Sequence, residues 1–492
     1  MKSRLTALFL VLFMLPLAMV SCNDKNNTQD TPAETIEKAD KPEVQASGDE
    51  YIFPALDCGE DDFTFLNVIA WIFYTTIVHE EMTGEVLDDA IYTRNRLIEE
   101  KFNVNIKEEK IDNGTVANTF KKTVLAGDEL YDAAYLPANF SGSNIGVMIT
   151  EGMFQNLTAI PELNLSEPWW NQNINKDARI GSSDALYFAG CDINIYNLQG
   201  AWCVYFNEDM FQNLGLDFPY AKVKNGKWTF DEFYSYAKAG AQLNGAENYK
   251  WNLESPAIYG HTSYEFASNA LIASAGEKYI TKDDNGMPRL AIESERYYNV
   301  CEKIAAMNKN EGEYLNANSY SIKGFHFMAI FNAGRAAMMI GELGAADDFK
   351  AMENVYGIVP LPKYDENQKE YYTLVHNSSP LLVVPVTNSN LPRTGTIIDA
   401  LAYVSHRDTT PVFYNITLSV KRLQNEESID MLKIIRDSVF IDFGIVFDWS
   451  MDLIGAVSSA LDSGKSEIAS VIEKNRDQVK ANMEKTMQYF GQ

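Results

Sequence analysis

The chain has 492 residues and a formal net charge of −27, with 46% hydrophobic and 12% aromatic residues. Because nucleic-acid binding depends on Lys and Arg neutralising phosphates, this acidic balance argues against nucleic acid as a partner. It also disfavours direct docking on an anionic membrane surface. A chain of this length exceeds the roughly 250–300 residues at which one hydrophobic core stops growing, so we expect two lobes.

The first residues have the pattern of a secretory leader. Lys2 and Arg4 precede the apolar stretch 7–20, which is shorter than the roughly 20 residues of a membrane-spanning helix. A small residue then precedes Cys22, an arrangement that resembles the lipobox of bacterial lipoproteins. The resemblance implies that the signal peptide 1–21 is removed and that Cys22 is lipidated, which anchors the protein to the membrane. The alternative is an ordinary cleaved leader with a chance cysteine.

The segment 22–50 is rich in Asn, Asp, Thr, Glu, Lys and Pro. It has too few large apolar side chains to offset the entropy of ordering, so we expect a disordered tether. A tether of this kind suits a globular domain held just off a membrane. No later stretch reaches the length of a membrane-spanning helix.

Four cysteines remain once Cys22 is assigned to lipid: Cys58, Cys191, Cys203 and Cys301. Cys191 and Cys203 flank a segment that reads as a hairpin or as paired strands, and an exported protein can form disulfides. The chain has no C-x-x-C motif, and spacing alone does not decide between a disulfide and free thiols.

The first folded segment alternates strands and helices. Short joints between these elements predict parallel β-α-β units, whose ligands lie beyond the carboxyl ends of the strands. Trp71 and Tyr74 follow the first strand, and Asn139 follows the third. The predicted elements are strand 63–70, helix 91–102, strand 104–108, helix 116–126 and strand 131–136.

The middle and the end of the chain continue the mixed pattern. Thr229 is the expected N-cap of a helix that runs to about Leu243, and Glu232 completes a capping box. From residue 429 onward the chain is expected to be mainly helical. The other predicted elements are strand 202–206, a helix end that leads into a strand over 331–341, strand 381–386 and helix 396–405.

Four segments in this order resemble the extracellular solute-binding proteins of bacterial ABC importers, in the sugar-binding family that includes the maltodextrin binders. Residues 204–216 look like the crossover strand and helix start of that family, and 227–233 look like its "TWDEF" helix. Residues 331–339 and 356–362 look like its "F-GKAAM" and "G-PLP" segments. Each motif alone is weak, and together they cover most of residues 60–450.

The resemblance implies an α/β fold of the type II periplasmic-binding-protein kind. Each of its two lobes is a mostly parallel sheet flanked by helices, with a hinge between the lobes. By analogy, lobe 1 is 51–200 plus 372–410, and lobe 2 is 201–371 plus 411–492. The resemblance also implies a monomer without a cofactor. The monomer would capture a carbohydrate in the interlobe cleft, with an oligosaccharide as the favoured ligand, and deliver it to the membrane subunits of an ABC permease.

This sequence departs from the family pattern at two places. Sugar binders often place a Trp where this chain has Gly341-Glu342-Leu343-Gly344. The tail that includes 440–449 is unlike that of the maltodextrin binders and looks more like a divergent branch common in anaerobic Gram-positive bacteria. We therefore expect a lipid-anchored protein on the extracellular face of the membrane of a Gram-positive bacterium.

A sugar site needs flat aromatic rings for the C–H faces of the sugar, and carboxylates or amides for its hydroxyls. For each Trp the alternative is packing in the core, and for Glu342 it is a solvated turn. The candidates by position are Trp71, Tyr74, Asn139, Trp202, Glu342, His376, Asn377, Asp448 and Trp449.

Motifs of catalysis and metal binding are incomplete in this sequence. His79-Glu80-Glu81 lacks the second His of a zinc-protease motif, and Ser459 stands where the first Gly of a phosphate-binding loop should precede Ser463-Gly-Lys-Ser. We therefore predict a binding protein rather than an enzyme, with no catalytic residue and no metal ligand. Two alternatives stay open: a surface glycan-active enzyme or adhesin, and a receptor for a peptide or another small solute.

Overall fold

The alternating segments after residue 60 build a mostly parallel sheet, as the sequence predicts. Strand β1 pairs in parallel with both β2 and β3, and β14 returns from far along the chain to pair antiparallel with β3. Helices α1 and α2 connect the three parallel strands. The bounds are β1 (Asp61–Ile69), α1 (Val86–Phe102), β2 (Val104–Asp112), α2 (Val116–Ala126), β3 (Ala133–Pro137) and β14 (Pro380–Val383).

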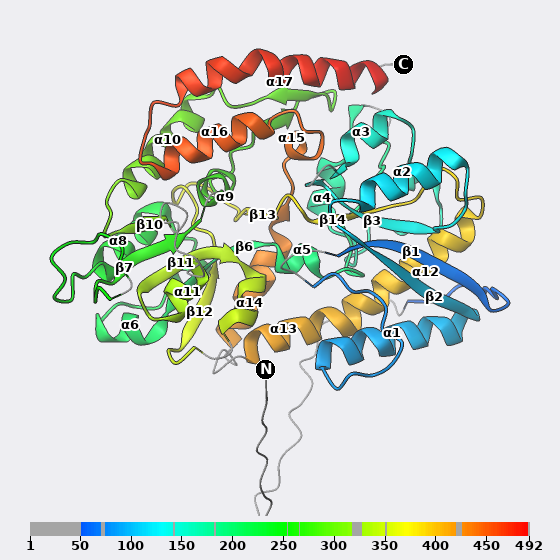
Figure 1. The fold of residues 1–492 in the computed structure, drawn as a ribbon, viewed down its shortest axis with the longest axis horizontal. Coiled ribbons are helices and arrows are strands. Elements are labelled where there is room, and N and C mark those ends of the chain that lie inside the picture. The colour runs from blue at the N-terminus through cyan, green and yellow to red at the C-terminus, as the bar shows by residue number, and fades with distance from the viewer. Residues whose placement is uncertain are drawn as a thin grey trace, which may run out of the picture. The chain divides into compact units, whose positions relative to one another are not determined.

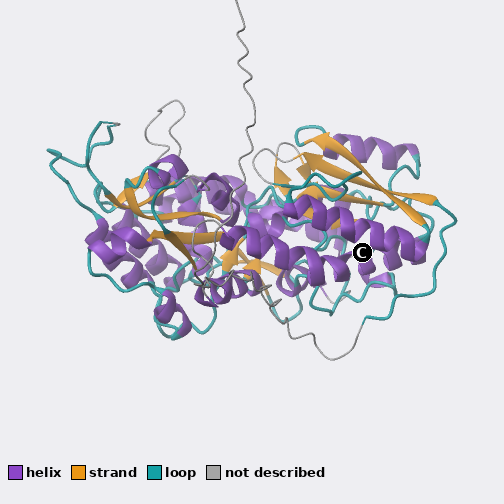
Figure 2. Ribbon diagram, turned by 90° about the horizontal axis from the view of Figure 1, so that it is seen from below, coloured by secondary structure: helices purple, strands orange, loops and turns teal. Residues whose placement is uncertain are grey.

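The computed structural model places residues 52–492 in one compact unit. Within the described part of this unit, Figure 2 shows the strands as separate groups, each covered by helices. The structure describes residues 51–69, 74–140, 143–181, 184–252, 254–264, 266–316, 327–349, 352–419 and 426–490.

The second sheet is a mixed one of five strands in the order β10-β7-β11-β6-β12. Strands β10, β7 and β11 are parallel, whereas β6 runs antiparallel to both β11 and β12. Most side chains of these strands are buried, so the sheet forms the core of the second lobe. The bounds are β6 (Trp202–Asn207), β7 (Tyr259–Ser263), β10 (Tyr314–Asn316), β11 (Ala336–Glu342) and β12 (Tyr356–Pro360).

A separate two-stranded ladder joins the segment between β12 and β14 to a segment that follows both sheets in the chain. Strand β13 (Thr373–Leu374) pairs in parallel with β15 (Val439–Phe440). Helix α13 (Thr410–Ser419) packs against α1, and α14 (Glu426–Asp437) packs against β12. The expected boundary between the lobes, residue 410, is the first residue of α13.

The C-terminal helices form a layer with two helices of the second lobe. Helix α16 packs against α9, α10 and α17, and Figure 1 shows α17, in red, lying beside α16. No helix in the described part of the chain combines the length and the apolar character needed to cross a membrane. The bounds are α9 (Ala267–Ser274), α10 (Glu295–Asn308), α15 (Phe443–Val446), α16 (Met451–Asp462) and α17 (Ala469–Phe490).

The segment between Cys191 and Cys203 is not the expected hairpin, because it contains helix α5 (Tyr196–Gln199). The four cysteines in the described part of the chain are free and buried. Cys191 instead contacts the hydroxyl of Tyr135, with 3.2 Å between sulfur and oxygen.

The predicted N-cap of helix α8 (Phe230–Gly240) is confirmed. The Thr229 side chain accepts the backbone N–H of Glu232 at 3.5 Å. The helix ends before the predicted Leu243, because the backbone of Gln242 pairs with that of Ile258. The remaining elements are β4 (Asn139–Phe140), β5 (Ser143–Asn144), α3 (Ile145–Thr150), η1 (Leu157–Ala159), α4 (Gln172–Asp177), α6 (Glu208–Asn213), α7 (Tyr220–Lys224), β8 (Ile280–Lys282), β9 (Pro288–Leu290), α11 (Phe327–Asn332), η4 (Leu343–Phe349), α12 (Leu391–Val404) and η5 (Ser405–Thr409).

Candidate ligand-binding site

Two of the predicted site residues lie side by side at one edge of the second sheet. Trp202 begins β6 and is the antiparallel partner of Glu342, which ends β11. Both side chains are buried, with 1% and 3% of their surface exposed. The carboxyl ends of parallel strands are where α/β folds bind ligands, and β11 ends at this edge.

Tyr264 joins this pair from the carboxyl end of the neighbouring strand β7. Its ring stacks on that of Trp202, with 5.3 Å between the centroids and 18° between the planes. Its hydroxyl donates a hydrogen bond to the carboxylate of Glu342. Burial raises the pKa of Glu342 to about 7, because the ionised form loses its hydration. The candidates chosen from sequence missed Tyr264.

His376 and Asn377 approach from the segment after β13. The backbone N–H of His376 donates to the carbonyl of Gly200 at 2.9 Å, and the carbonyl of Asn377 accepts from the N–H of Asn139 at 3.1 Å. Burial lowers the pKa of His376 to about 4, so the ring is neutral at physiological pH. Its Nδ1 accepts the backbone N–H of Ser378 at 3.2 Å, which leaves the ring proton on Nε2.

Trp202, His376 and Asn377 line a small cavity, which we call the Trp202 cavity. Its volume is about 20 Å³, the space of roughly one water molecule. This space is too small for a sugar ring. The lining includes Trp202, Phe266, Asn269, His376, Asn377 and Ile445.

Asn139 and Asp448 meet near the Trp202 cavity. The Asn139 side-chain amide donates to the carbonyl of Ile445 at 2.8 Å and to a carboxylate oxygen of Asp448 at 3.1 Å. Asp448 is exposed and has a φ of 56°, the left-handed region that Asp adopts more readily than most residues. The end of β3 is thus joined to the segment that follows α15.

The structure does not bring every predicted side chain to this place. The Tyr74 hydroxyl donates to Asp88 at 2.7 Å, on helix α1. The Trp449 indole stacks on Phe447 at 4.8 Å and donates to Thr486 of α17 at 2.9 Å. Trp71 and Cys22 lie outside the described residues.

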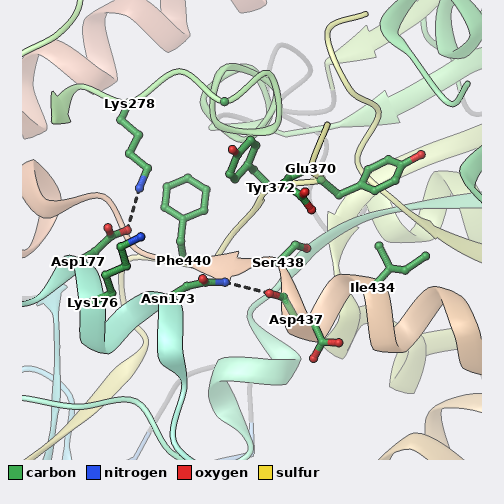
Figure 3. Close-up of a pocket in the computed structure, with 12 residues that line it drawn as sticks. Asn173, Lys176, Asp177, Lys278, Glu370, Tyr372, Ile434, Asp437, Ser438 and Phe440 are labelled. Carbon is green, nitrogen blue, oxygen red and sulfur yellow. Dashed lines mark hydrogen bonds and ion pairs between the residues drawn. The ribbon is translucent and has the colours of Figure 1, made fainter. Parts of the chain in front are cut away.

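A larger cavity of about 660 Å³ is lined by Tyr372, the residue directly before β13, and we call it the Tyr372 cavity (Figure 3). On its wall the Lys278 ammonium pairs with Asp177 at 2.7 Å and lies 4.6 Å from the centre of the Phe440 ring. The amide of Asn173 donates to the carbonyl of Asp437 at 2.9 Å. The lining of the Tyr372 cavity is highly charged and includes no predicted site residue. The Trp202 cavity is therefore the better candidate for the ligand site.

Comparisons with known proteins identify the fold and the family. The model of the bacterial extracellular solute-binding protein family matches residues 87–391. Comparison with curated proteins by sequence gave no significant match. The expected two-lobed α/β fold of the type II periplasmic binding proteins is confirmed by solved structures that cover most of the chain.

Three of these solved structures illustrate the likeness. The cyclic α-maltosyl-1,6-maltose binding protein of Arthrobacter globiformis has a TM-score of 0.58 and 12% identity, covering 86% of this chain and 99% of its own. The maltose-binding protein of Listeria monocytogenes, in complex with maltose, has a TM-score of 0.56 and 13% identity, covering 87% and 98%.

A second protein of Listeria monocytogenes, an ABC substrate-binding protein in complex with cycloalternan, has a TM-score of 0.52 and 13% identity. It covers 88% of this chain and 99% of its own. The family model matches more than half of this chain, and the fold agrees with it. The chain therefore belongs to the bacterial extracellular solute-binding proteins.

Proposed function

We propose that this protein captures a carbohydrate between its two lobes and delivers it to the membrane subunits of an ABC permease, and that an oligosaccharide is its preferred ligand. The observation that carries the proposal is that Trp202, His376 and Asn377 line one cavity, and that Glu342 is the strand partner of Trp202 at the carboxyl end of β11. An indole ring suits the C–H face of a sugar, and carboxylate, imidazole and amide groups suit its hydroxyls. Three structures of the same fold carry names that refer to oligosaccharides or maltose.

Binding in this proposal needs a hinge motion. The Trp202 cavity of about 20 Å³ is too small for a sugar ring, so the free protein must open before the ligand enters. The ligand would first bind to the second lobe, where Trp202 and Glu342 lie. Closure would then bring His376 and Asn377 onto the ligand from the segment after β13.

We propose the lobe boundaries from the packing of the helices. Lobe 1 is 52–200 plus 372–419, and lobe 2 is 201–371 plus 426–490. These ranges keep the sequence-based division but move α13 to lobe 1, because it packs on α1.

We also propose that Cys22 carries the lipid anchor and that 22–50 is a tether on the extracellular face of the membrane. Expression with a labelled fatty acid tests the anchor. The wild type is expected to incorporate label and to sediment with membranes, whereas Cys22→Ser is expected to lose both properties. Label in the Cys22→Ser variant would contradict the assignment.

A thermal-shift screen tests the ligand class. The panel contains maltose, maltotetraose, cellotetraose and xylotetraose, with tetra-alanine as the peptide control. A ligand at 100 times its Kd stabilises the folded state by about 2.7 kcal/mol, so a true ligand raises the melting temperature. Stabilisation by tetra-alanine alone would contradict the proposal, and release of new reducing ends from a tetrasaccharide would show an enzyme instead.

A further inference from the structure

Two of the groups that the proposed sugar needs are already occupied by a side chain of this protein. The ring of Trp202 is covered by the ring of Tyr264, and the carboxylate of Glu342 accepts the Tyr264 hydroxyl. A pyranose bound in this place would use the same two contacts, one for its apolar face and one for a hydroxyl. Tyr264 thus presents to the site the flat face and the hydroxyl of a sugar ring.

We propose that Tyr264 is a built-in substitute for one sugar ring, and that the ligand must displace it from Trp202 and Glu342. This inference rests on the proposed function. It adds a specificity rule: only a ligand that offers both a flat apolar face and a suitably placed hydroxyl replaces both contacts. A pyranose meets this requirement, whereas a linear polyol or a peptide without an aromatic ring does not.

Tyr264 is partly exposed, whereas Trp202 and Glu342 are buried. Its ring lies between Trp202 on one face and Phe327 on the other, with 4.6 Å between the centroids of Tyr264 and Phe327. Trp202 and Phe327 are buried, with 1% and 2% of their surface exposed. Tyr264 also lies just beyond the end of β7 rather than inside the sheet. Two residues further on, Phe266 lines the Trp202 cavity with a φ of 75°, which is strained for a bulky side chain. The backbone here therefore stores strain next to the cavity.

Displacement of Tyr264 makes the apparent affinity weaker than the intrinsic one. When only a fraction of the molecules has the site free, the apparent Kd rises by the inverse of that fraction. Removal of the ring should therefore tighten binding. If Tyr264 were instead a fixed wall on which the sugar stacks, removal of the ring would weaken binding, so the sign of the effect separates the two roles.

The test is a calorimetric titration of the wild type, Tyr264→Ala and Tyr264→Phe with the tetrasaccharide that stabilises the protein most in the screen above. We expect Tyr264→Ala to bind about tenfold more tightly than the wild type. Tyr264→Phe keeps the ring but loses the hydrogen bond to Glu342, so its Kd should lie between the two. Tyr314→Phe is the matched control, because Tyr314 is in the same sheet but stacks on His261, at 4.7 Å, rather than on Trp202. Its Kd should equal that of the wild type.

If Tyr264→Ala binds the sugar no more tightly than the wild type does, the inference is overturned, but the proposed function stays in place. If Tyr264→Ala does not fold, the same criterion applies to Tyr264→Phe. Binding by Tyr264→Ala to a sugar that the wild type does not bind supports the inference. If no panel sugar binds either protein, the carbohydrate proposal fails and the inference fails with it.

Discussion

A carboxyl group that is buried beside an indole ring changes its charge close to neutral pH, and Glu342 is such a group. Burial raises its pKa from the ordinary 4.5 to about 7. A folded-state pKa above the unfolded value means that the carboxyl contributes stability at low pH. This contribution is lost as the pH rises from about 4.5 through about 7. Ligand binding has the opposite dependence, because a sugar hydroxyl donates best to the ionised carboxylate.

Affinity for the sugar should therefore fall as the pH is lowered. With a pKa of about 7, the ionised fraction of Glu342 changes about tenfold between pH 8 and pH 6, and the Kd should rise by the same factor. Glu342→Gln keeps an acceptor that does not titrate, so its Kd should stay constant over this range. Calorimetric titrations at pH 6, 7 and 8 measure both profiles, and equal slopes for the two proteins would contradict the role of Glu342.

At this scale, sequence alone could predict residues that lie at strand ends. Trp202 and Glu342 were chosen for such positions, and the structure places them side by side. Tyr264 was missed because its contact with Glu342 depends on β7 being the neighbour of β11 in the sheet. The local sequence pattern does not predict the order of strands in a sheet. Trp449 was chosen as a candidate site residue by its position, but its indole stacks on Phe447 and donates to Thr486 on α17, 37 residues later in the chain.

Among the elements, α15 depends on one buried carboxylate. Asp442 caps this helix by accepting the N–H of Gly444 at 2.8 Å, and its other oxygen accepts the N–H of Tyr279 at 2.9 Å. Burial raises the pKa of Asp442 to about 6, so the group is ionised at pH 7.5. The carboxylate thus ties the segment before β8 to α15, which carries Ile445 of the cavity wall.

Asp442→Ala should lower the free energy of unfolding by about 1–3 kcal/mol, because two buried N–H donors lose their acceptor. Urea denaturation at pH 7.5 measures the change. Asp452→Ala is the matched control, since Asp452 is an exposed acidic residue in the first turn of α16. Its effect should stay below about 1 kcal/mol, and an equal loss in both variants would contradict the account of Asp442.

Elements with strong local signals were predicted closely. The bounds of α2 agree with the prediction, because an amphipathic stretch ends at Gly127, which adopts a left-handed conformation with φ of 74°. The supposed hairpin between Cys191 and Cys203 was wrong, since two apolar runs close in sequence read equally as paired strands. The short helix α5 between them has no side-chain N-cap, so the sequence lacked the usual signal for the start of a helix.

For the whole molecule, contacts between the two proposed lobes join opposite walls of the Tyr372 cavity. Lys278 of lobe 2 pairs with Asp177 of lobe 1 at 2.7 Å. The ammonium of Lys282 donates to the carbonyl of Asp177 at 2.7 Å, so both lysines hold the last turn of α4. Opening of the lobes for ligand entry would have to loosen these contacts.

Asp177→Asn should therefore favour the open form. An ion pair of partial exposure contributes about 0.2–1 kcal/mol, which shifts the equilibrium by a factor of about 1.4–5. Small-angle X-ray scattering of the free protein is expected to show a larger radius of gyration for this variant. Asp62→Asn breaks a pair with Lys107 at 2.5 Å inside the first sheet, and it serves as the control. Equal radii for wild type and Asp177→Asn would contradict the bridging role.

The two-lobed plan was predictable from the length of the chain and from four family-like segments. The boundary at residue 410 stays a prediction, because it depends on the lobe to which α13 belongs. The size of the cavity was beyond the sequence, since it depends on how far the lobes are closed.

A calorimetric titration of Trp202→Leu with the best tetrasaccharide of the screen tests most directly whether an indole at the edge of the second sheet holds the sugar. Leucine keeps an apolar side chain but removes the flat ring. The account predicts that the Kd rises at least about 30-fold, equivalent to ~2 kcal/mol. Trp251→Leu, which changes a tryptophan that packs against Arg335 outside the cavity lining, should leave the Kd unchanged. A Trp202→Leu variant that folds and binds the sugar as tightly as the wild type would contradict the account.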